Sequence, residues 1–168
     1  TEARTYHENH EYVDLGLSVK WATANIGENK PEKSGDYFAW GETSPKSNYD
    51  WSTYLWCKHS DNMLESLTKY NTQSDLGAVD KLTTLNLSDD AAKQNWGGDW
   101  RMPTAKEMYE LLTQCDWEAT ATGYEVISRV NGKSIFLPAG GCMNKTSIFK
   151  PGEYGYYWSS GLVENDAK

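Results

Sequence analysis

The sequence predicts an α+β fold in which two short helices and several antiparallel strands are joined by long, ordered loops. Three observations favour this class. Apolar and polar residues alternate over residues 13–21, an apolar stripe with helical spacing follows Pro103, and an Asn-Gly pair at 131–132 separates two runs typical of strands. Because the helices are grouped between strands rather than alternating with them, the order differs from that of α/β proteins.

Composition narrows the class of protein. The chain has 168 residues, of which 38% are apolar and 24% charged, which is typical of a folded domain rather than a disordered chain. Its net charge of −8 repels phosphate backbones, so we expect no nucleic-acid partner. No run of residues is apolar and long enough to span a membrane, so we expect no membrane-spanning segment.

The domain organisation is simple. Residues 1–11 are polar and without periodicity, so we expect a flexible lead-in. Residues 12–168 contain no internal repeat, low-complexity segment or linker, and we expect them to form a single domain. Within it, the alternation over residues 13–21 predicts a first strand with one buried face.

Long loops follow this first strand. Residues 22–60 are rich in Gly, Asn, Ser, Pro and aromatic residues, and residues 37–40 predict a short strand that ends at Gly41. Loops of this length inside a compact domain are usually functional or disordered. Because tyrosine and tryptophan recur through residues 49–56, we expect ordered loops held by aromatic rings, continuing as polar loop through residues 61–87.

The first helix is predicted to follow Ser88, which is a suitable N-cap. Asp89 and Asp90 then lie in the first turn, where carboxylates interact favourably with the helix dipole, and Gly97-Gly98 ends the helix. The same two carboxylates are candidates for a calcium site with loop carbonyls. Their spacing lacks the regular alternation of a calcium-binding loop, so helix capping is the preferred interpretation.

The second helix has the clearest local signals. Thr104 and Glu107 form a capping box after Pro103. The apolar positions that follow, at i, i+3, i+4 and i+7, predict a helix over residues 105–115. This stripe consists of Met108, Leu111, Leu112 and Cys115.

The last strands are predicted from turn chemistry and ring content. Residues 124–130 and 133–137 flank Asn131-Gly132, the preferred pair for a two-residue type I′ turn, and therefore predict a hairpin. Residues 154–160 are rich in tyrosine and tryptophan and predict a further strand.

Cysteine and histidine are assigned structural roles. The odd number of cysteines leaves at least one free thiol, and Cys57 with Cys115 is the disulfide that we expect if one forms. Cys115 lies on the buried stripe, so we interpret it as a core thiol rather than a nucleophile. The run HENH at residues 7–10 lacks the H-E-x-x-H spacing of zinc proteases. We expect no metal or other cofactor apart from the calcium alternative.

The functional candidates are aromatic. Loops on a rigid scaffold usually carry binding, and rings with polar edges suit sugars as well as protein surfaces. The loops at 43–60 and 143–157 therefore supply the candidate ligand-binding residues, with core packing as the alternative role for many of the rings. The candidates are Tyr49, Trp51, Tyr54, Trp56, Tyr154 and Tyr156.

Five segments between residues 12 and 160 read YVDLGLSVKWATANIG, GDYFAWGE, LSDDAAKQNWGGDWRMPTAKEMYELL, SIFLPAGG and GYYWSS. Together they resemble the Fibrobacter succinogenes major paralogous domain, a family of secreted and lipid-anchored proteins of Bacteroidetes-type bacteria. The resemblance implies a C-type-lectin-like fold of the branch that includes formylglycine-generating enzymes. It also implies a location outside the cell or on the outer-membrane surface, with the periplasm as an alternative.

Two details of the resemblance concern function. Residues 101–104 with Glu107 are similar to the R-x-P-T-x-x-E segment of that branch, and we expect Arg101 to be a buried structural cation paired with a carboxylate. The enzymes of the branch use a late cysteine pair, and this sequence has no cysteine after Cys142.

A third detail concerns the end of the chain. C-type-lectin-like domains pair their terminal strands, and the family pattern usually continues beyond Ser160. We therefore expect the chain to lack C-terminal strands and to expose a strand edge, or to receive a strand from elsewhere. Glu164-Asn165-Asp166 resembles the calcium segment of animal lectins, but without its tryptophan.

Three functions follow from these observations. The resemblance, the aromatic loops and the missing catalytic set favour a non-catalytic extracellular module that binds a glycan or a cell-surface protein. A structural, fimbria-like assembly component that uses an exposed strand edge is the first alternative. A degenerate enzyme of the formylglycine-generating type is the second.

Overall fold

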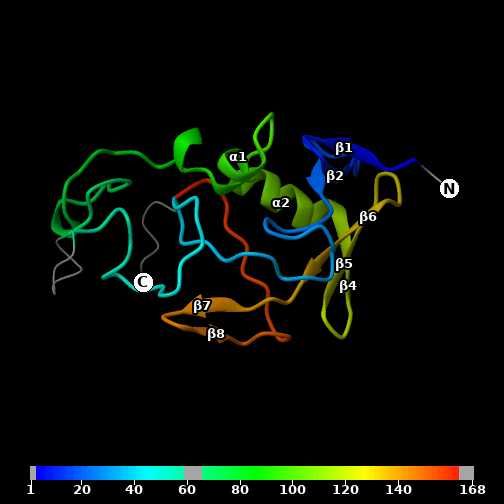
Figure 1. The fold of residues 1–168 in the computed structure, drawn as a ribbon. Helices are drawn as coiled ribbons and strands as arrows, with labels where there is room; N and C mark the ends of the chain where they lie inside the picture. The colour runs from blue at the N-terminus through cyan, green and yellow to red at the C-terminus, as the bar shows by residue number, and fades with distance from the viewer. Residues whose placement is uncertain (1–2, 59–65, 163–168) are drawn as a thin grey trace.

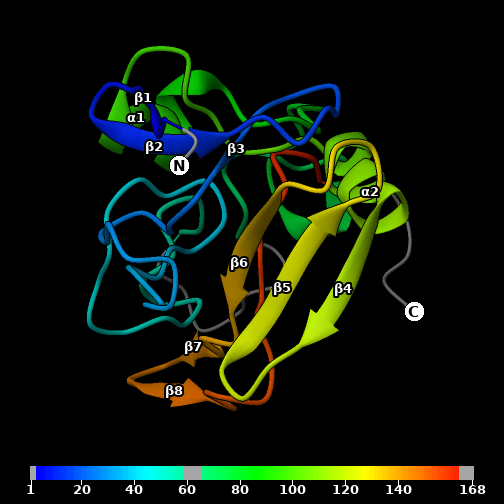
Figure 2. The ribbon, with the colours of Figure 1, turned by 90° about the vertical axis from the view of Figure 1, so that its right-hand side faces the viewer.

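The computed structural model describes residues 3–58 and 66–162, and in this part of the chain it confirms a mixed α+β class (Figures 1 and 2). Two α-helices and three small antiparallel sheets lie among long loops. The strands are β1 (Thr5–His7), β2 (His10–Val13), β3 (Trp21–Ala22), β4 (Cys115–Ala119), β5 (Gly123–Ser128), β6 (Ser134–Pro138), β7 (Cys142–Asn144) and β8 (Ser147–Phe149), and the helices are α1 (Ala91–Trp96) and α2 (Ala105–Gln114). Short 3-10 turns cover Ser74–Leu76 and Leu87–Asp89.

Residues 5–13, most of which the sequence assigns to a lead-in over residues 1–11, form a hairpin. β1 and β2 pair as an antiparallel hairpin, and β3 adds to β2. Glu8 and Asn9 join the hairpin with positive φ angles of 49° and 65°, as a type I′ turn requires. The sequence does not reveal this hairpin because its strands are polar and lack an alternating apolar face.

The predicted strand over residues 13–21 is wrong, although its alternation of buried and exposed residues is real. β2 ends at Val13 and β3 begins only at Trp21. Gly16, at a φ of 71°, turns the chain between them, and the Asp14 carboxylate accepts the Gly16 N–H at 2.8 Å. Leu15 is fully buried, so the segment contributes to the core without forming a ladder.

Both helices are present. In α1 the N-cap is Asp90 rather than Ser88: its carboxylate accepts the Lys93 N–H at 2.9 Å, and Gly97 ends the helix. α2 begins with the predicted capping box, in which Thr104 and Glu107 exchange hydrogen bonds. The predicted apolar stripe is only partly buried, because Leu111 and Cys115 lie in the core whereas Leu112 is exposed.

The largest sheet has the strand order β4-β5-β6. The hairpin of β5 and β6 confirms the predicted pairing of these strands, but its turn differs. Ile127 pairs with Ser134, and Ser128 N–H donates to Lys133 O, so the connection is longer than two residues. Asn131 does not share the positive φ of Gly132, which excludes a type I′ turn at this pair.

The hydrophobic core lies where α2 meets this sheet and the segment that follows β2. Its buried members are Leu15, Leu111, Cys115, Val126 and Ile135. Val13, Leu17, Trp21, Trp117 and Leu137 pack around them. Cys115 is therefore a core thiol, as predicted.

Two further predicted strands are wrong. Neither residues 37–40 nor residues 154–160 belong to a sheet. Residues 155–162 run beside the loops from the β7–β8 hairpin towards α1 (Figure 1) and are held by isolated bridges, such as Gly141 with Gly155. The Glu164-Asn165-Asp166 segment and the end of the chain lie outside the described residues.

The predicted disulfide is also wrong, because Cys57, Cys115 and Cys142 are all free thiols. Cys57 is buried in the loop region, where its Sγ contacts Ser66 Oγ, whereas Cys115 lies in the core against β5. Across residues 3–58 and 66–162, no helix is long and apolar enough to cross a membrane.

Candidate functional site

A cleft of about 1660 Å³ runs through the molecule. Residues of α1, α2 and β6 line it, together with residues from the loop at 34–54 and from the segment 155–159. Aromatic rings dominate the last two contributions, and we call this space the aromatic cleft. Its volume exceeds the roughly 300–1,000 Å³ of a typical small-molecule site, and its lining reaches from exposed rings to core residues such as Leu111 and Ile135.

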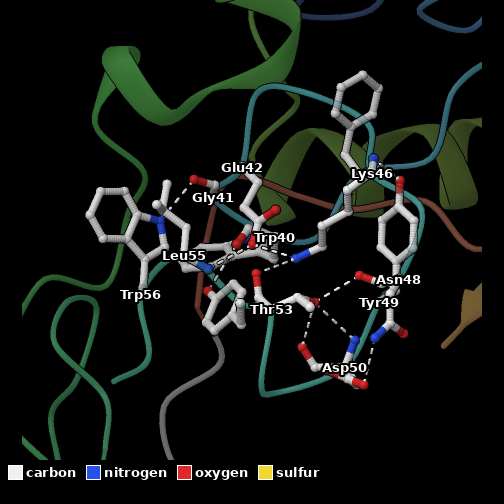
Figure 3. Close-up of polar contacts among 12 residues, drawn as sticks. Trp40, Gly41, Glu42, Lys46, Asn48, Tyr49, Asp50, Thr53, Leu55 and Trp56 are labelled. Carbon is white, nitrogen blue, oxygen red and sulfur yellow. Dashed lines mark hydrogen bonds and ion pairs between the residues drawn. The ribbon is translucent and has the colours of Figure 1, made fainter. Parts of the chain in front are cut away.

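A buried ion pair fixes the loop wall of the aromatic cleft (Figure 3). The Glu42 carboxylate, on a residue that is only 7% exposed, accepts from Lys46 Nζ and from the Leu55 N–H, both at 2.8 Å. Lys46 Nζ also donates to Thr53 O at 2.9 Å. Two ends of the loop are thereby tied to one side chain, which gives it a defined shape.

Tyr49 and Tyr54 anchor the same wall with their hydroxyl groups. Tyr49 Oη donates to Tyr37 O at 2.6 Å, and Tyr54 Oη donates to Trp40 O at 2.9 Å. Lys46 Nζ lies 5.5 Å and 6.0 Å from their ring centroids. Burial raises the pKa of both phenols, and Glu42 adds to the effect at Tyr54. These two rings therefore hold the loop.

Trp56 has a structural role and does not line the aromatic cleft. Its Nε1 donates to Gly41 O at 2.8 Å, and Lys69 Nζ lies 4.5 Å from its ring centroid. Lys69 in turn pairs with Asp89, a buried carboxylate that also accepts from the Tyr70 hydroxyl. Burial acts to raise the pKa of Asp89, but the hydrogen bonds from Lys69 and Tyr70 bring it below its usual value.

Trp51 is the exposed ring of this loop. It lies beside a turn in which the Asp50 carboxylate accepts from Ser52 and from Asn48 Nδ2, and these hydrogen bonds lower the pKa of Asp50. Its ring meets Tyr54 edge-on, with centroids 5.6 Å apart and an interplanar angle of 89°. An anchored ring thus packs against Trp51, which stays half exposed at the aromatic cleft.

The segment 154–158, which reaches the opposite side of the cleft, carries exposed rings. Tyr154, Tyr156 and Trp158 are 51%, 53% and 56% exposed, and Trp51 on the loop wall is 50% exposed. Tyr157, between them, points inward and donates its hydroxyl to Pro138 O at 2.8 Å. Trp158 was not among the sequence candidates, although the alternation of rings at 154, 156 and 158 is the signal that could have identified it.

Main-chain hydrogen bonds join the loop wall to the turn between β7 and β8. Tyr49 N–H donates to Lys145 O at 2.8 Å, and Lys145 N–H donates back to Tyr49 O at 3.0 Å. The structure therefore brings four of the six sequence candidates to one cleft and leaves two outside its lining. Tyr49, Trp51, Tyr54 and Tyr156 line the aromatic cleft, whereas Trp56 and Tyr154 do not.

The polar residues that the sequence singled out are structural. His7 Nε2 accepts the Asp99 N–H at 3.0 Å, and His10 stacks on Trp96 with ring centroids 4.1 Å apart; burial lowers the pKa of His10. Arg101 forms the expected pair with Glu107, at 2.6 Å and 2.9 Å, but its side chain is partly exposed rather than buried.

Nothing in the described residues assembles a metal centre: there is no group of three or more His, Cys, Asp or Glu side chains that could share an ion. Burial raises the pKa of the Cys115 thiol, which disfavours the reactive thiolate. Comparison of the chain with protein-family models, with characterised proteins and with solved structures gives no match. The aromatic cleft is thus the candidate functional site, and it offers ring faces and hydroxyl groups to a ligand.

Proposed function

We propose that the protein is a non-catalytic binding module, displayed outside a bacterial cell, that holds a glycan in the aromatic cleft. One observation carries the proposal: Trp51 and Tyr156, which lie far apart in the sequence, are both half-exposed and line the same cleft. Aromatic faces with polar edges suit sugars, which present both C–H surfaces and hydroxyl groups. A protein ligand is the alternative that the test below separates.

The charged groups of the cleft support binding rather than catalysis. Three cations of the cleft, Lys46, Lys69 and Arg101, are already paired with a carboxylate. A nucleophile or general acid–base group needs a free and suitably tuned side chain. Cys57 and Cys115 are buried, and Cys142 is the half-buried thiol of the cleft, with no second cysteine beside it in the lining to form the pair that enzymes of the formylglycine-generating type use.

The fold and the location are part of the same proposal. The segments that resemble the Fibrobacter succinogenes major paralogous domain support a C-type-lectin-like fold and an extracellular or outer-membrane setting. The mixed α+β architecture with long ordered loops agrees with such a fold at the level of its class. In this proposal, the rigid α2 and β4–β6 unit supports loops that carry the ligand site.

A glycan array probed with and without calcium tests the proposal. We expect binding to one class of glycan, and we expect Trp51→Ala and Tyr156→Ala each to abolish it. Tyr124→Ala is the matched control, because Tyr124 is an exposed ring on β5 that does not line the cleft. A blank array together with capture of one envelope protein, lost in the same two variants, would replace the glycan by a protein ligand.

A second function is favoured by one feature of the sheet. β6 is an edge strand of β4-β5-β6, and its residues 135–138 line the cleft. An edge strand can accept a strand from a partner in a fimbria-like assembly where that edge is accessible. Concentration-dependent association in sedimentation experiments would favour this function, and a monomer at high concentration would argue against it.

A further inference from the structure

Three exposed rings lie at alternate positions of the segment 154–158. Tyr154, Tyr156 and Trp158 are exposed, whereas Tyr157 points inward and donates its hydroxyl group to Pro138 O. The ring centroids of Tyr154 and Tyr156 are 6.3 Å apart. We call the three exposed residues the aromatic row.

One ring of the aromatic row is held in position before any ligand arrives. Trp158 Nε1 donates to Phe38 O at 2.9 Å, which fixes the indole on the opposite loop. Lys150 Nζ lies 4.9 Å from the Tyr154 ring centroid. Within the described residues, the hydroxyl groups of Tyr154 and Tyr156 make no hydrogen bond. The indole is therefore preorganised, and the two phenol groups are available to a ligand.

The aromatic row begins outside the cleft and continues into it. Tyr156 and Trp158 line the cleft, whereas Tyr154 lies beyond its lining. A ligand that uses all three rings must therefore extend past the end of the cleft. This geometry fits the interior of a chain better than a single terminal sugar.

The charge of the molecule selects among glycan chains. The net charge of −8 repels polyanions. Near the row, Lys150 is paired with Glu153 at 3.3 Å. In the cleft, the described charged residues outside the ion pairs are three acids and two bases, so the acids outnumber the bases and the local charge disfavours an acidic sugar. They are Asp36, Asp50, Asp99, Lys20 and Lys145.

We infer that the ligand is a neutral, linear glycan that lies along the aromatic row, and that Trp158 contacts it directly. This inference rests on the proposed function, because it specifies the ligand of the same cleft. Each ring stacks on one part of the chain, so affinity depends on chain length. The hydroxyl groups of Tyr154 and Tyr156 take hydrogen bonds from the sugar.

The test is calorimetric titration of the intact protein with a ladder of neutral linear oligosaccharides from the class found on the array, and with an acidic polysaccharide. We expect affinity to rise with chain length until the aromatic row is covered and then to level off. Trp158→Ala and Tyr156→Ala should each weaken binding of the longest oligosaccharide by roughly tenfold or more. Tyr154→Ala should weaken only binding of ligands long enough to reach it.

Two further variants keep the test decisive. Trp158→Phe retains a ring but not the hydrogen bond to Phe38 O, so it should retain most of the affinity. Tyr124→Ala should bind as the wild type does, and urea denaturation should show that all variants fold.

The outcomes separate this inference from the proposed function. Length-independent binding, a preference for the acidic polysaccharide, or binding that is insensitive to Trp158→Ala would overturn the inference while the glycan-binding function stands. Failure of every glycan to bind would overturn both. A length-dependent affinity that falls in the row variants alone supports both.

Discussion

The loop at 37–56 and the segment 154–158 are both rich in tyrosine and tryptophan, but their rings serve opposite purposes. In the loop, the polar edges of Tyr54 and Trp56 donate to main-chain carbonyls, and the rings are largely withdrawn from solvent. In the segment, Tyr154 and Tyr156 are half-exposed and their hydroxyl groups have no partner in the described residues.

The comparison shows that ring content alone does not identify a binding surface. What distinguishes Tyr49 and Tyr54 from Tyr154 and Tyr156 is whether the hydroxyl group already has a partner within the described residues. A ring O–H or N–H group that is hydrogen-bonded within the protein fixes the backbone around it, because removing its partner would leave a buried polar group without a hydrogen bond. A group left without a partner adds little to the stability of the fold and remains available to a ligand.

The largest expected loss of stability comes from breaking the ion pair of Glu42 with Lys46. Glu42→Ala leaves the Lys46 ammonium without its carboxylate and the Leu55 N–H without its acceptor. We expect a loss of about 3 kcal/mol in the free energy of unfolding, measured by urea denaturation. The loop rings should also become more exposed to fluorescence quenchers.

Asp116→Ala is the matched control for this change. It breaks the pair of Arg129 with Asp116, whose side chains are 56% and 60% exposed, and it should cost well under 1 kcal/mol. Equal losses in the two variants would mean that the Glu42–Lys46 pair does not hold the loop.

A smaller effect is expected from removing single hydroxyl groups. Tyr54→Phe leaves Trp40 O without its donor and should cost about 1 kcal/mol of unfolding free energy. Tyr156→Phe removes a hydroxyl group with no partner in the described residues and should leave stability unchanged within about 0.5 kcal/mol. If Tyr156→Phe destabilised the protein as much as Tyr54→Phe, the two hydroxyl groups would not differ in their structural role.

The smallest expected effect is a change in the stability contribution of Tyr54 at alkaline pH. Burial raises the pKa of Tyr54 above its unfolded value of about 10, so the fold favours the neutral phenol. This contribution is fully present below about pH 10 and is lost as the pH rises through the folded-state pKa. The stability gap between wild type and Tyr54→Phe, from urea midpoints at about pH 8 and about pH 11, should therefore shrink. A constant gap would show that the phenol ionises as readily in the folded state as in the unfolded state.

The elements that the sequence predicted correctly depend on local signals. α2 follows from the capping box at Thr104 and Glu107 and from its apolar spacing, all within one segment. The strand predicted over residues 13–21 failed because Asp14 and Gly16 turn the chain, although the burial pattern survived. The β1–β2 hairpin was missed because its strands are polar and lack an alternating apolar face, and the contact that docks it, from Trp100 to His7 O, is distant in sequence.

For the site, the sequence identified the aromatic loops but not the direction of each ring. The acceptors that turn Tyr49, Tyr54 and Trp56 inward are the carbonyls of residues 37, 40 and 41, and a carbonyl carries no sequence signature. Trp158 was overlooked because residues 154–160 were interpreted as a strand, whereas its alternation marks a row of exposed rings. Partners of main-chain groups become visible only once the chain is folded.

The unpartnered hydroxyl groups of Tyr154 and Tyr156 also affect which substitutions the protein can tolerate during evolution. Substitutions at these positions remove no side-chain hydrogen bond within the described residues. They should therefore change the free energy of unfolding little and can accumulate by neutral drift. The loop at 37–56 has no such freedom, because its rings and charges hold one another. Descendants of this chain can therefore acquire new preferences at the aromatic row while inheriting the same scaffold.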